Sequence, residues 1–169
     1  MLSVFRWLMR LLTGLVALGL LCLIAVYYFL ERSIPDYTES FRIPGLSAPV
    51  EILRNNDNVP HIFGASDPDV IFALGFAHAQ DRQWQITMLR RTAQGRLSEV
   101  FGRRTLKIDE LLRRYDLYTL SLQSVEAQDD PTRAALEAYA AGVNSWIGQI
   151  NSGARGRGSP EFFFFSNEI

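Results

Sequence analysis

The sequence is poor in the residues that most often build disulfides and metal centres. It has one cysteine, Cys22, and two histidines, His61 and His78. One cysteine excludes an intrachain disulfide, and two histidines with no second cysteine do not complete a typical zinc site. The formal net charge is -1, which gives no reason to expect a nucleic-acid partner. No internal repeat is visible in the sequence either, so a solenoid of similar helices is excluded.

The charged residues that are present are unevenly placed. Of the 169 residues, 48% are hydrophobic and 21% are charged, which is enough for one modest domain once a membrane segment is subtracted. Basic side chains gather between Arg90 and Arg114, with acids such as Glu99, Asp109 and Glu110 among them. We interpret this stretch as solvated helix faces rather than as a binding surface.

An N-terminal apolar run is long enough to cross a membrane. Residues 11–30 contain no charge, and as a helix they would be about 30 Å long, the thickness of a hydrocarbon core. Because Arg6 and Arg10 precede the run, the positive-inside rule keeps the N-terminus in the cytoplasm. We therefore predict a single-pass membrane signal anchor at residues 1–30, with the remaining chain exported to the periplasm or the cell exterior.

A cleaved signal peptide is the alternative interpretation of the same run. Cleavage requires small residues at the cut, but the run ends in Tyr27, Tyr28, Phe29 and Leu30 without an A-x-A site. We favour an uncleaved anchor, in which the two tyrosines lie in the interfacial aromatic belt on the exported side.

A linker and a β-hairpin are expected next. Residues 31–48 hold two prolines and a glycine without a sustained period, which indicates a linker to a domain at residues 49–169. The alternating residues 50–54 and 59–63 flank a cluster of asparagines and an aspartate that tolerate left-handed conformations. This pattern predicts a hairpin whose proline lies at a strand start or a sheet edge.

A long helix should follow the hairpin. Ser66 can cap it, and Asp69 at the third helical position completes a capping box. The helix is apolar nearly all round over residues 70–79, amphipathic after Gln80, and predicted to stop at Gly95.

One acid interrupts the apolar stripe of this helix. The stripe advances by alternating steps of four and three and consists of Val70, Leu74, Ala77, Trp84 and Met88. Asp81 falls on the same stripe, so we predict a buried carboxylate with dedicated partners.

Three more helices are predicted downstream. The first is short, from Arg96 to Phe101, and the second is one continuous helix from about Lys107 to before Gln128. In the third, Asp130 caps the helix and Pro131 occupies its first position. Its apolar face is Leu136, Tyr139, Val143, Trp146 and Ile150. A flexible loop at residues 151–159 comes after it.

Two segments carry a longer signature than any single motif: VEILRNNDNVPHIFGAS from Val50 and GFAHAQDRQWQITMLRRTAQGRLSEVFG from Gly75. Their specific pieces are Val59-Pro60-His61-Ile62, Gly75, His78-Ala79-Gln80-Asp81-Arg82, Trp84-Gln85, Arg90-Arg91, Gly95-Arg96-Leu97-Ser98-Glu99 and Gly102. In this run, from about Val50 to Phe162, the sequence resembles the N-terminal part of the penicillin acylase family.

The resemblance implies the α-chain part of an N-terminal-nucleophile hydrolase. Its fold would be α+β: a transmembrane helix, a β-hairpin and a mainly helical portion of a four-layered αββα core. Members of that family are precursors that cut themselves into a small α chain and a large β chain. The first residue of the β chain attacks the amide, and its α-amino group, with a pKa near neutral, serves as the base.

The resemblance transfers no catalytic residue to this chain. Gly158-Ser159 and Ser166-Asn167 are the dipeptides closest to a processing site, yet few residues follow either. The calcium ligands of several family members lie mainly in the β chain, so calcium is implied only for a full-length protein. Four consecutive phenylalanines at residues 162–165 would be a sticky terminus. We therefore expect an incomplete α chain that is inactive alone.

Several polar and aromatic residues could be read as site residues, but structural roles are favoured for them. We interpret His61 and His78 as structural rather than as metal ligands or bases. Asp81, beside Arg82 and Gln85, is assigned to the scaffold rather than to acid catalysis. The aromatic residues are assigned to the core rather than to an acyl pocket; they are Trp84, Trp146, Tyr115 and Tyr139. The sequence thus predicts no catalytic, cofactor-binding or metal-binding residue.

The expected activity of the complete protein is hydrolysis of the amide of an N-acylated small molecule. Its partners would be its own β chain, that substrate, and the membrane through residues 11–30. The alternatives are a membrane-anchored helical binding protein without activity, or a degenerate relative of the family.

Overall fold

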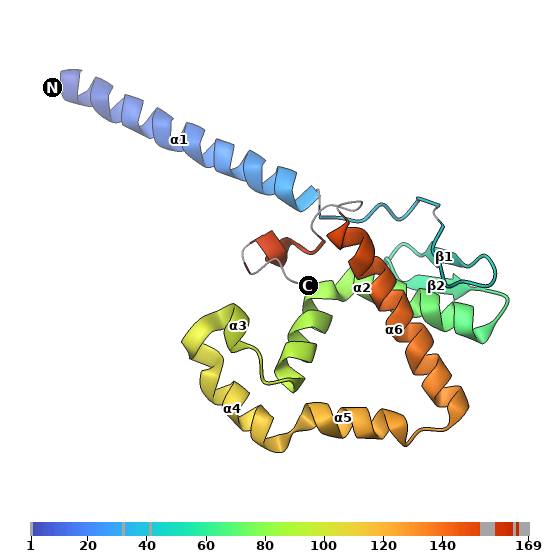
Figure 1. The fold of residues 1–169 in the computed structure, drawn as a ribbon. Helices are drawn as coiled ribbons and strands as arrows, with labels where there is room; N and C mark the ends of the chain where they lie inside the picture. Colours follow the sequence, from blue (N-terminus) through green and yellow to red (C-terminus); the bar gives the residue numbers. More distant parts are fainter. Residues whose placement is uncertain (1, 32, 41, 153–157, 164, 166–169) are drawn as a thin grey trace.

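The N-terminal helix projects away from the rest of the molecule (Figure 1). This computed structural model describes residues 2–31, 33–40, 42–152, 158–163 and 165. Helix α1 (Leu2–Glu31) covers the predicted span and begins earlier than expected. It is the one helix among the described residues that is long and apolar enough to cross a membrane, with a mean hydropathy of 2.3. A signal sequence would share these properties.

The predicted hairpin is confirmed. Strands β1 (Glu51–Arg54) and β2 (Pro60–Phe63) pair antiparallel, with Glu51 opposite Phe63. In the turn, the Asn55 side chain accepts hydrogen bonds from the backbone N–H groups of Asp57 and Val59, and Asn58 adopts φ 62°. Asparagine tolerates this left-handed conformation better than most residues do.

Helix α2 (Asp67–Ala93) begins as predicted. The Ser66 hydroxyl accepts from the Asp69 N–H at the N-terminus, and Gly95 follows the C-terminus with φ 62°. The prediction did not include a kink at Arg82, where φ is -135°. The helix is therefore two straight segments that meet where the apolar part ends.

The buried face of α2 is not the predicted stripe. Of the five predicted apolar positions only Ala77 is buried; the face in contact with the core instead runs through Phe72, Phe76, Ala79 and Gln83. Residues 70–79 are apolar nearly all round, so several stripes are possible. The crossing of a second helix decides which one is buried.

That second helix is α6 (Asp130–Asn151), which crosses α2 closely (Figure 1). Its N-cap is Asp129, one residue earlier than predicted, because the Asp129 carboxylate accepts from the Thr132 N–H at 2.9 Å. Four of the five predicted core positions on α6 are at least half-buried, and Leu136 is exposed. The core cluster consists of Phe76, Ala79, Val143, Trp146 and Ile150.

The middle of the chain forms a bent helical arm. It comprises α3 (Ser98–Phe101), the 3₁₀ helix η1 (Gly102–Thr105), α4 (Leu106–Tyr115) and α5 (Leu117–Glu126). The prediction of one helix from Lys107 is wrong, because Asp116 adopts φ 50° and ψ 43° and separates α4 from α5. Aspartate visits this left-handed region more readily than most residues.

The phenylalanine run folds back onto α2. In the 3₁₀ helix η2 (Pro160–Phe163), Phe162 is buried and its ring meets Trp84 edge to face at 5.2 Å. Phe165 stacks on the same indole at 5.3 Å. These two rings are therefore packed rather than sticky, while most of the predicted 151–159 loop lies outside the described residues.

Candidate functional site

Arg54 at the end of β1 joins three segments of the chain. Its guanidinium donates to both Asp81 carboxylate oxygens, at 2.8 and 2.9 Å, to the Gln80 side chain at 3.1 Å and to the Asn58 carbonyl at 3.1 Å. The same guanidinium lies over the Tyr37 ring, 4.0 Å from its centre. The paired, parallel hydrogen bonds of this kind are the strongest that an arginine forms.

Asp81 has the partners that the sequence predicted but not the burial. Its side chain is 25% exposed, whereas that of Arg54 is 8% exposed. Asp81 lies on the outer side of the α2 kink, so the buried charge of the pair is the arginine. The carboxylate is occupied by Arg54 and by the Tyr37 hydroxyl at 3.4 Å, which suits a scaffold role.

Asp69 holds the segment before the hairpin against α2. Its buried carboxylate accepts from the Ser47 N–H at 2.9 Å, from the Ser47 hydroxyl at 2.6 Å and from the Ser66 hydroxyl at 2.8 Å. The hydrogen bonds from Ser47, then the one from Ser66, hold the pKa of Asp69 below its usual value. The described residues of the predicted linker after α1 thus form no helix or strand, and Ser47 binds this segment to the domain.

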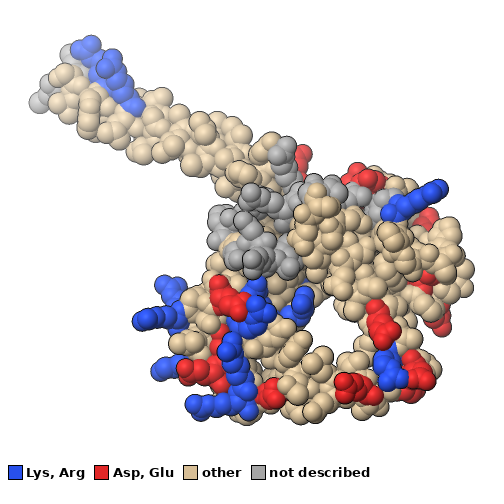
Figure 2. Space-filling view, viewed as in Figure 1, with Lys and Arg blue, Asp and Glu red and all other residues tan. Residues whose placement is uncertain are grey.

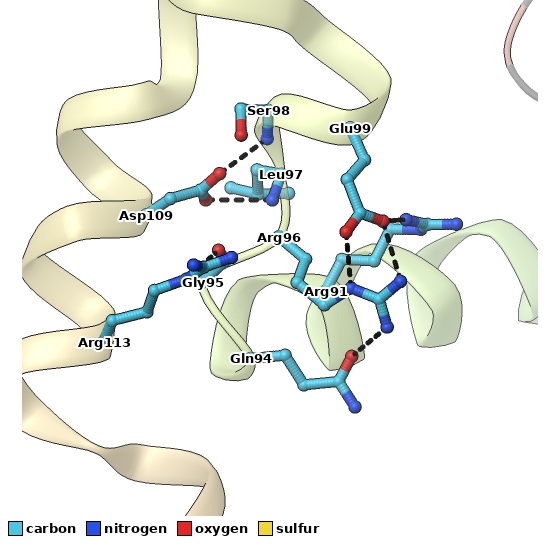
Figure 3. A network of polar contacts seen from close by, with 9 residues as sticks. All are labelled: Arg91, Gln94, Gly95, Arg96, Leu97, Ser98, Glu99, Asp109 and Arg113. Carbon is cyan, nitrogen blue, oxygen red and sulfur yellow. Dashed lines mark hydrogen bonds and ion pairs between the residues drawn. The ribbon is translucent and has the colours of Figure 1, made fainter.

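The Gly95–Glu99 signature forms a second polar network (Figure 3). Asp109 on α4 accepts from the backbone N–H groups of Leu97 at 2.9 Å and Ser98 at 2.7 Å. One turn later, Arg113 donates to the Gly95 carbonyl at 2.8 Å. These bonds fix the turn between α2 and α3 onto the next helix.

Charge on the outer side of that turn is compensated within the network. Arg96 donates to both Glu99 oxygens, at 2.6 and 2.9 Å, and Arg91 donates to Glu99 as well. The hydrogen bond from Arg96 lowers the pKa of Glu99. Burial alone would raise the pKa of Asp109, but hydrogen bonds from Ser98 and Leu97 and the Arg113 charge outweigh it, and the pKa is lowered.

The basic stretch contains acids throughout. Figure 2 shows Lys and Arg side chains beside Asp and Glu along the part of the arm drawn as α3 and α4 in Figure 1. Arg91, Arg96 and Arg113 are engaged by Glu99 or by Gly95. This distribution fits solvated helix faces better than a site for an anionic partner.

A groove of about 1000 Å³ lies between the end of α1, the α2 kink and the chain leading to η2. His78 and Tyr139 meet in it, with Nδ1 and the hydroxyl oxygen 3.1 Å apart. Gln83 and Trp146 also line it, and the Gln83 amide and the Trp146 indole nitrogen are buried without hydrogen-bond partners among the residues that the structure describes. Gly158 closes over Gln83, since a Cβ there would lie 2.5 Å from the Gln83 oxygen.

The residues considered as site candidates, and assigned to structural roles, lie in separate parts of the described structure. His61 is exposed on β2, far along the chain from exposed His78 on α2. Arg82 donates to Gln85 at 3.4 Å, whereas the side-chain hydrogen bonds of Arg54 go to Asp81, Gln80 and Asn58. Trp146 belongs to the core cluster, and half-buried Tyr139 packs against that cluster. Trp84 is half-buried against Phe162 of η2, and Tyr115 is exposed.

The candidate processing and metal positions give no site either. Gly158 is buried and the Ser159 hydroxyl donates to Glu161, while Ser166-Asn167 lies outside the described residues. Within the described ranges, no three His, Cys, Asp or Glu side chains lie close enough to hold a metal ion.

Sequence reasoning missed the acids that organise the networks. Asp69 was recognised as a capping residue, but its bonds to Ser47 depend on a contact across 22 residues. Asp109 and Arg113 are four residues apart on one helix face, a spacing that could have suggested a joint role. The role of Arg54 could not be predicted from its neighbours in the sequence, because an arginine at a strand end is common and indicates no particular partner.

Comparison with known proteins gives one consistent result. The family model described as "Penicillin amidase" matches residues 49–169. Penicillin acylase 2 proenzyme from Pseudomonas sp. (strain SE83) is 39% identical over 118 residues, which are 70% of this chain and 15% of that protein. Acyl-homoserine lactone acylase QuiP from Pseudomonas syringae pv. tomato is 36% identical over 64% of this chain and 13% of its own length.

A solved structure shows the same relation in three dimensions. The thermostable penicillin G acylase from Alcaligenes faecalis superposes with a TM-score of 0.62 at 26% identity, covering 72% of this chain and 64% of that chain. This chain thus spans only 15% and 13% of the two curated relatives named above.

Proposed function

The chain belongs to the penicillin amidase family, and we propose that it is the α-chain part of an N-terminal-nucleophile amidohydrolase. The observation that carries the proposal is the match of residues 49–169 to the family model. The superposition on a penicillin G acylase supports it. The complete enzyme would be made as a precursor that is cleaved into this α chain and a larger β chain with the four-layered αββα core.

The two chains of the proposed enzyme would have different roles in catalysis. The described acids Asp69, Asp81 and Asp109 are all engaged in scaffold hydrogen bonds. As membership of the family implies, we assign the nucleophile and its base to the first residue of the β chain, whose hydroxyl or thiol attacks the acyl carbon while its amine accepts the proton. The α chain would serve as a structural scaffold in which α2, α6 and the arm are held in fixed positions.

The substrate is proposed to be an N-acylated small molecule with a linear amide. The relatives include penicillin acylases and acyl-homoserine lactone acylases. A β-lactam side chain, an acyl-homoserine lactone and a lipopeptide share the bond that this chemistry cleaves. The reaction adds water across the C–N bond and releases a carboxylic acid and an amine.

The enzyme is further proposed to be fixed to the cytoplasmic membrane by α1. The support is the length and mean hydropathy of this helix, 2.3, and the two arginines that precede its uncharged part. Figure 2 shows a rod without charged side chains between the arginines near its start and the domain. The domain would then work on the exported side.

The decisive experiment is to read the coding sequence downstream of the Ile169 codon and to express the whole reading frame. A Gly-Ser, Gly-Thr or Gly-Cys junction followed by a long β-rich segment is expected. The purified protein should consist of two chains and release acid from a chromogenic N-acyl anilide.

The matched control replaces the first residue of the β chain with alanine. This variant should remain one uncleaved chain without hydrolysis, since the same group performs both reactions. A stop codon directly after Ile169 would contradict the proposal and favour a binding protein or a degenerate relative.

A further inference from the structure

The groove beside the α2 kink begins where the apolar helix α1 ends. Leu30, in the last turn of α1, lines it together with Ile34 and Pro35 of the following segment. On the opposite wall are Ile86 and Leu89 of α2. Two walls from distant parts of the sequence therefore present aliphatic side chains to one open space.

Two large apolar side chains that line this groove, among polar ones, are strongly exposed. Ile34 is 66% exposed and Leu89 is 69% exposed, the highest value among the large apolar residues of α2. Exposed apolar residues are ordinary when single, but these two face one groove of about 1000 Å³. That volume is at the upper end of the roughly 300–1000 Å³ of small-molecule pockets, and apolar walls select an apolar occupant.

The distance from the groove to a bilayer is limited by a short tether. Tyr37 follows Glu31 by six residues and is held by Arg54 and Asp81. Six extended residues reach at most about 20 Å. If α1 spans the membrane, the groove therefore opens beside the headgroup layer and its rim residues are within reach of lipid tails.

We infer that this groove binds one acyl chain of a phospholipid from the bilayer that holds α1. The inference rests on the membrane location given under Proposed function and adds a lipid site to it. An acyl chain fits because it is the apolar molecule present at high concentration at the end of α1, and because no charge is needed to hold it. Polar residues also line the groove, among them Asp57 and Arg82, and are available to the lipid headgroup.

The test uses the full chain in nanodiscs containing a phosphatidylcholine with a photoreactive diazirine in one acyl chain. After irradiation and trypsin digestion, mass spectrometry locates the lipid adducts. Both walls of the groove should be labelled, in the peptides Ser33–Arg42 and Gln83–Arg90. Labelling per peptide should be at least threefold higher than in Tyr115–Arg133, which carries the exposed leucines of α5.

The variant Leu89→Asp places a carboxylate at the rim and leaves the opposite wall unchanged. It should reduce labelling of Ser33–Arg42 at least threefold, an effect on a peptide that the substitution does not alter. The matched control, Leu120→Asp on α5, changes a leucine of 52% exposure and should leave both groove peptides as in the wild type.

Two outcomes would overturn the inference. One is labelling of the groove peptides no stronger than that of the α5 peptide; the other is a Leu89→Asp variant that labels Ser33–Arg42 normally. Resistance of the chain to carbonate extraction is measured in parallel. If the chain is extracted, the proposed anchor has failed; if it is retained and the groove is unlabelled, only the lipid site has failed.

Discussion

At the scale of single residues, the Arg54–Asp81 pair shows how a buried cation depends on an exposed acid. The Asp81→Ala variant should lower the free energy of unfolding by about 2 kcal/mol. This value lies between the cost for a surface pair and that for a buried pair, since only the arginine is buried. Chemical denaturation of the chain in detergent measures it.

The neighbouring Arg82 supplies the control for this substitution. Its side chain is exposed and its described bond is a long one to Gln85, so Arg82→Ala should change stability by less than about 0.5 kcal/mol. If Asp81→Ala were as stable as the wild type, the contacts of Arg54 with Asn58, Gln80 and Tyr37 would be enough to stabilise its buried charge.

Asp109 should make the arm sensitive to acid. Its pKa is lowered in the folded protein from an ordinary value of 3.8. Because the pKa is lower in the folded than in the unfolded protein, the ionised Asp109 carboxylate stabilises the fold. This stabilisation is fully present above pH 3.8 and is lost as the pH falls through the pKa of Asp109 in the folded protein. We expect Asp109→Asn to flatten this acid limb and to cost about 2 kcal/mol at neutral pH, because one backbone N–H loses its acceptor.

The measurement is the unfolding free energy of wild type and variant between pH 2 and pH 7. Glu110→Gln is the matched control, as Glu110 is exposed on the same helix, and its acid limb should equal that of the wild type. An unchanged acid limb in Asp109→Asn would contradict the role given to this carboxylate.

At the scale of elements, two glycines permit the α2–α6 crossing. A Cβ on Gly75 would lie 2.1 Å from the Tyr139 carbonyl oxygen, and one on Gly142 would lie 1.9 Å from the Phe72 carbonyl oxygen. The obstacle is backbone in both cases, so the helices must separate to admit a methyl group. We expect Gly142→Ala to cost more than about 3 kcal/mol by overpacking.

Gly148 on the same helix is the control, because a Cβ there would meet nothing within 4 Å. Gly148→Ala should instead stabilise the protein by up to about 1 kcal/mol through helix propensity. Thermal unfolding of the two variants distinguishes a steric clash at Gly142 from a general effect of alanine in α6. A general effect would move both melting temperatures in the same direction.

The elements were more predictable than their faces. The hairpin, the Ser66 cap and the two long helices followed from local chemistry that acts within a few residues. The buried stripe of α2 did not, because it is selected by the glycine crossing with α6. The break at Asp116 was also missed, since an aspartate in a left-handed conformation has no local pattern that separates it from an aspartate within a helix.

At the scale of the whole molecule, the resemblance identified the family but the networks could not be predicted. Asp69 contacts Ser47 and Arg54 contacts Asp81 across 22 and 27 residues, and such pairs become visible only after folding. The groove is equally non-local, with walls from the end of α1 and from α2. Sequence patterns report what a residue does to its neighbours, whereas these features depend on distant segments.

Helix α5 gives the prediction that belongs to the molecule as a whole. Its apolar residues lie all round the helix, yet every residue of Leu117–Glu126 is exposed, and Figure 2 shows an opening between the arm and the crossed helices. A ten-residue helix without packing is marginal in water. Its backbone amides should therefore exchange with deuterium at least a hundredfold faster than those of residues 70–79 in α2.

Hydrogen exchange with mass spectrometry on the full chain in nanodiscs measures this difference, and α6 serves as the internal reference for a packed helix. In the two-chain protein proposed above, the β chain should cover α5 and slow its exchange toward that of α6, because an all-round apolar helix is stable when it is buried on several sides. Slow exchange of α5 in this chain alone would mean that the helix needs no partner, and the exposed apolar arm would then require another explanation.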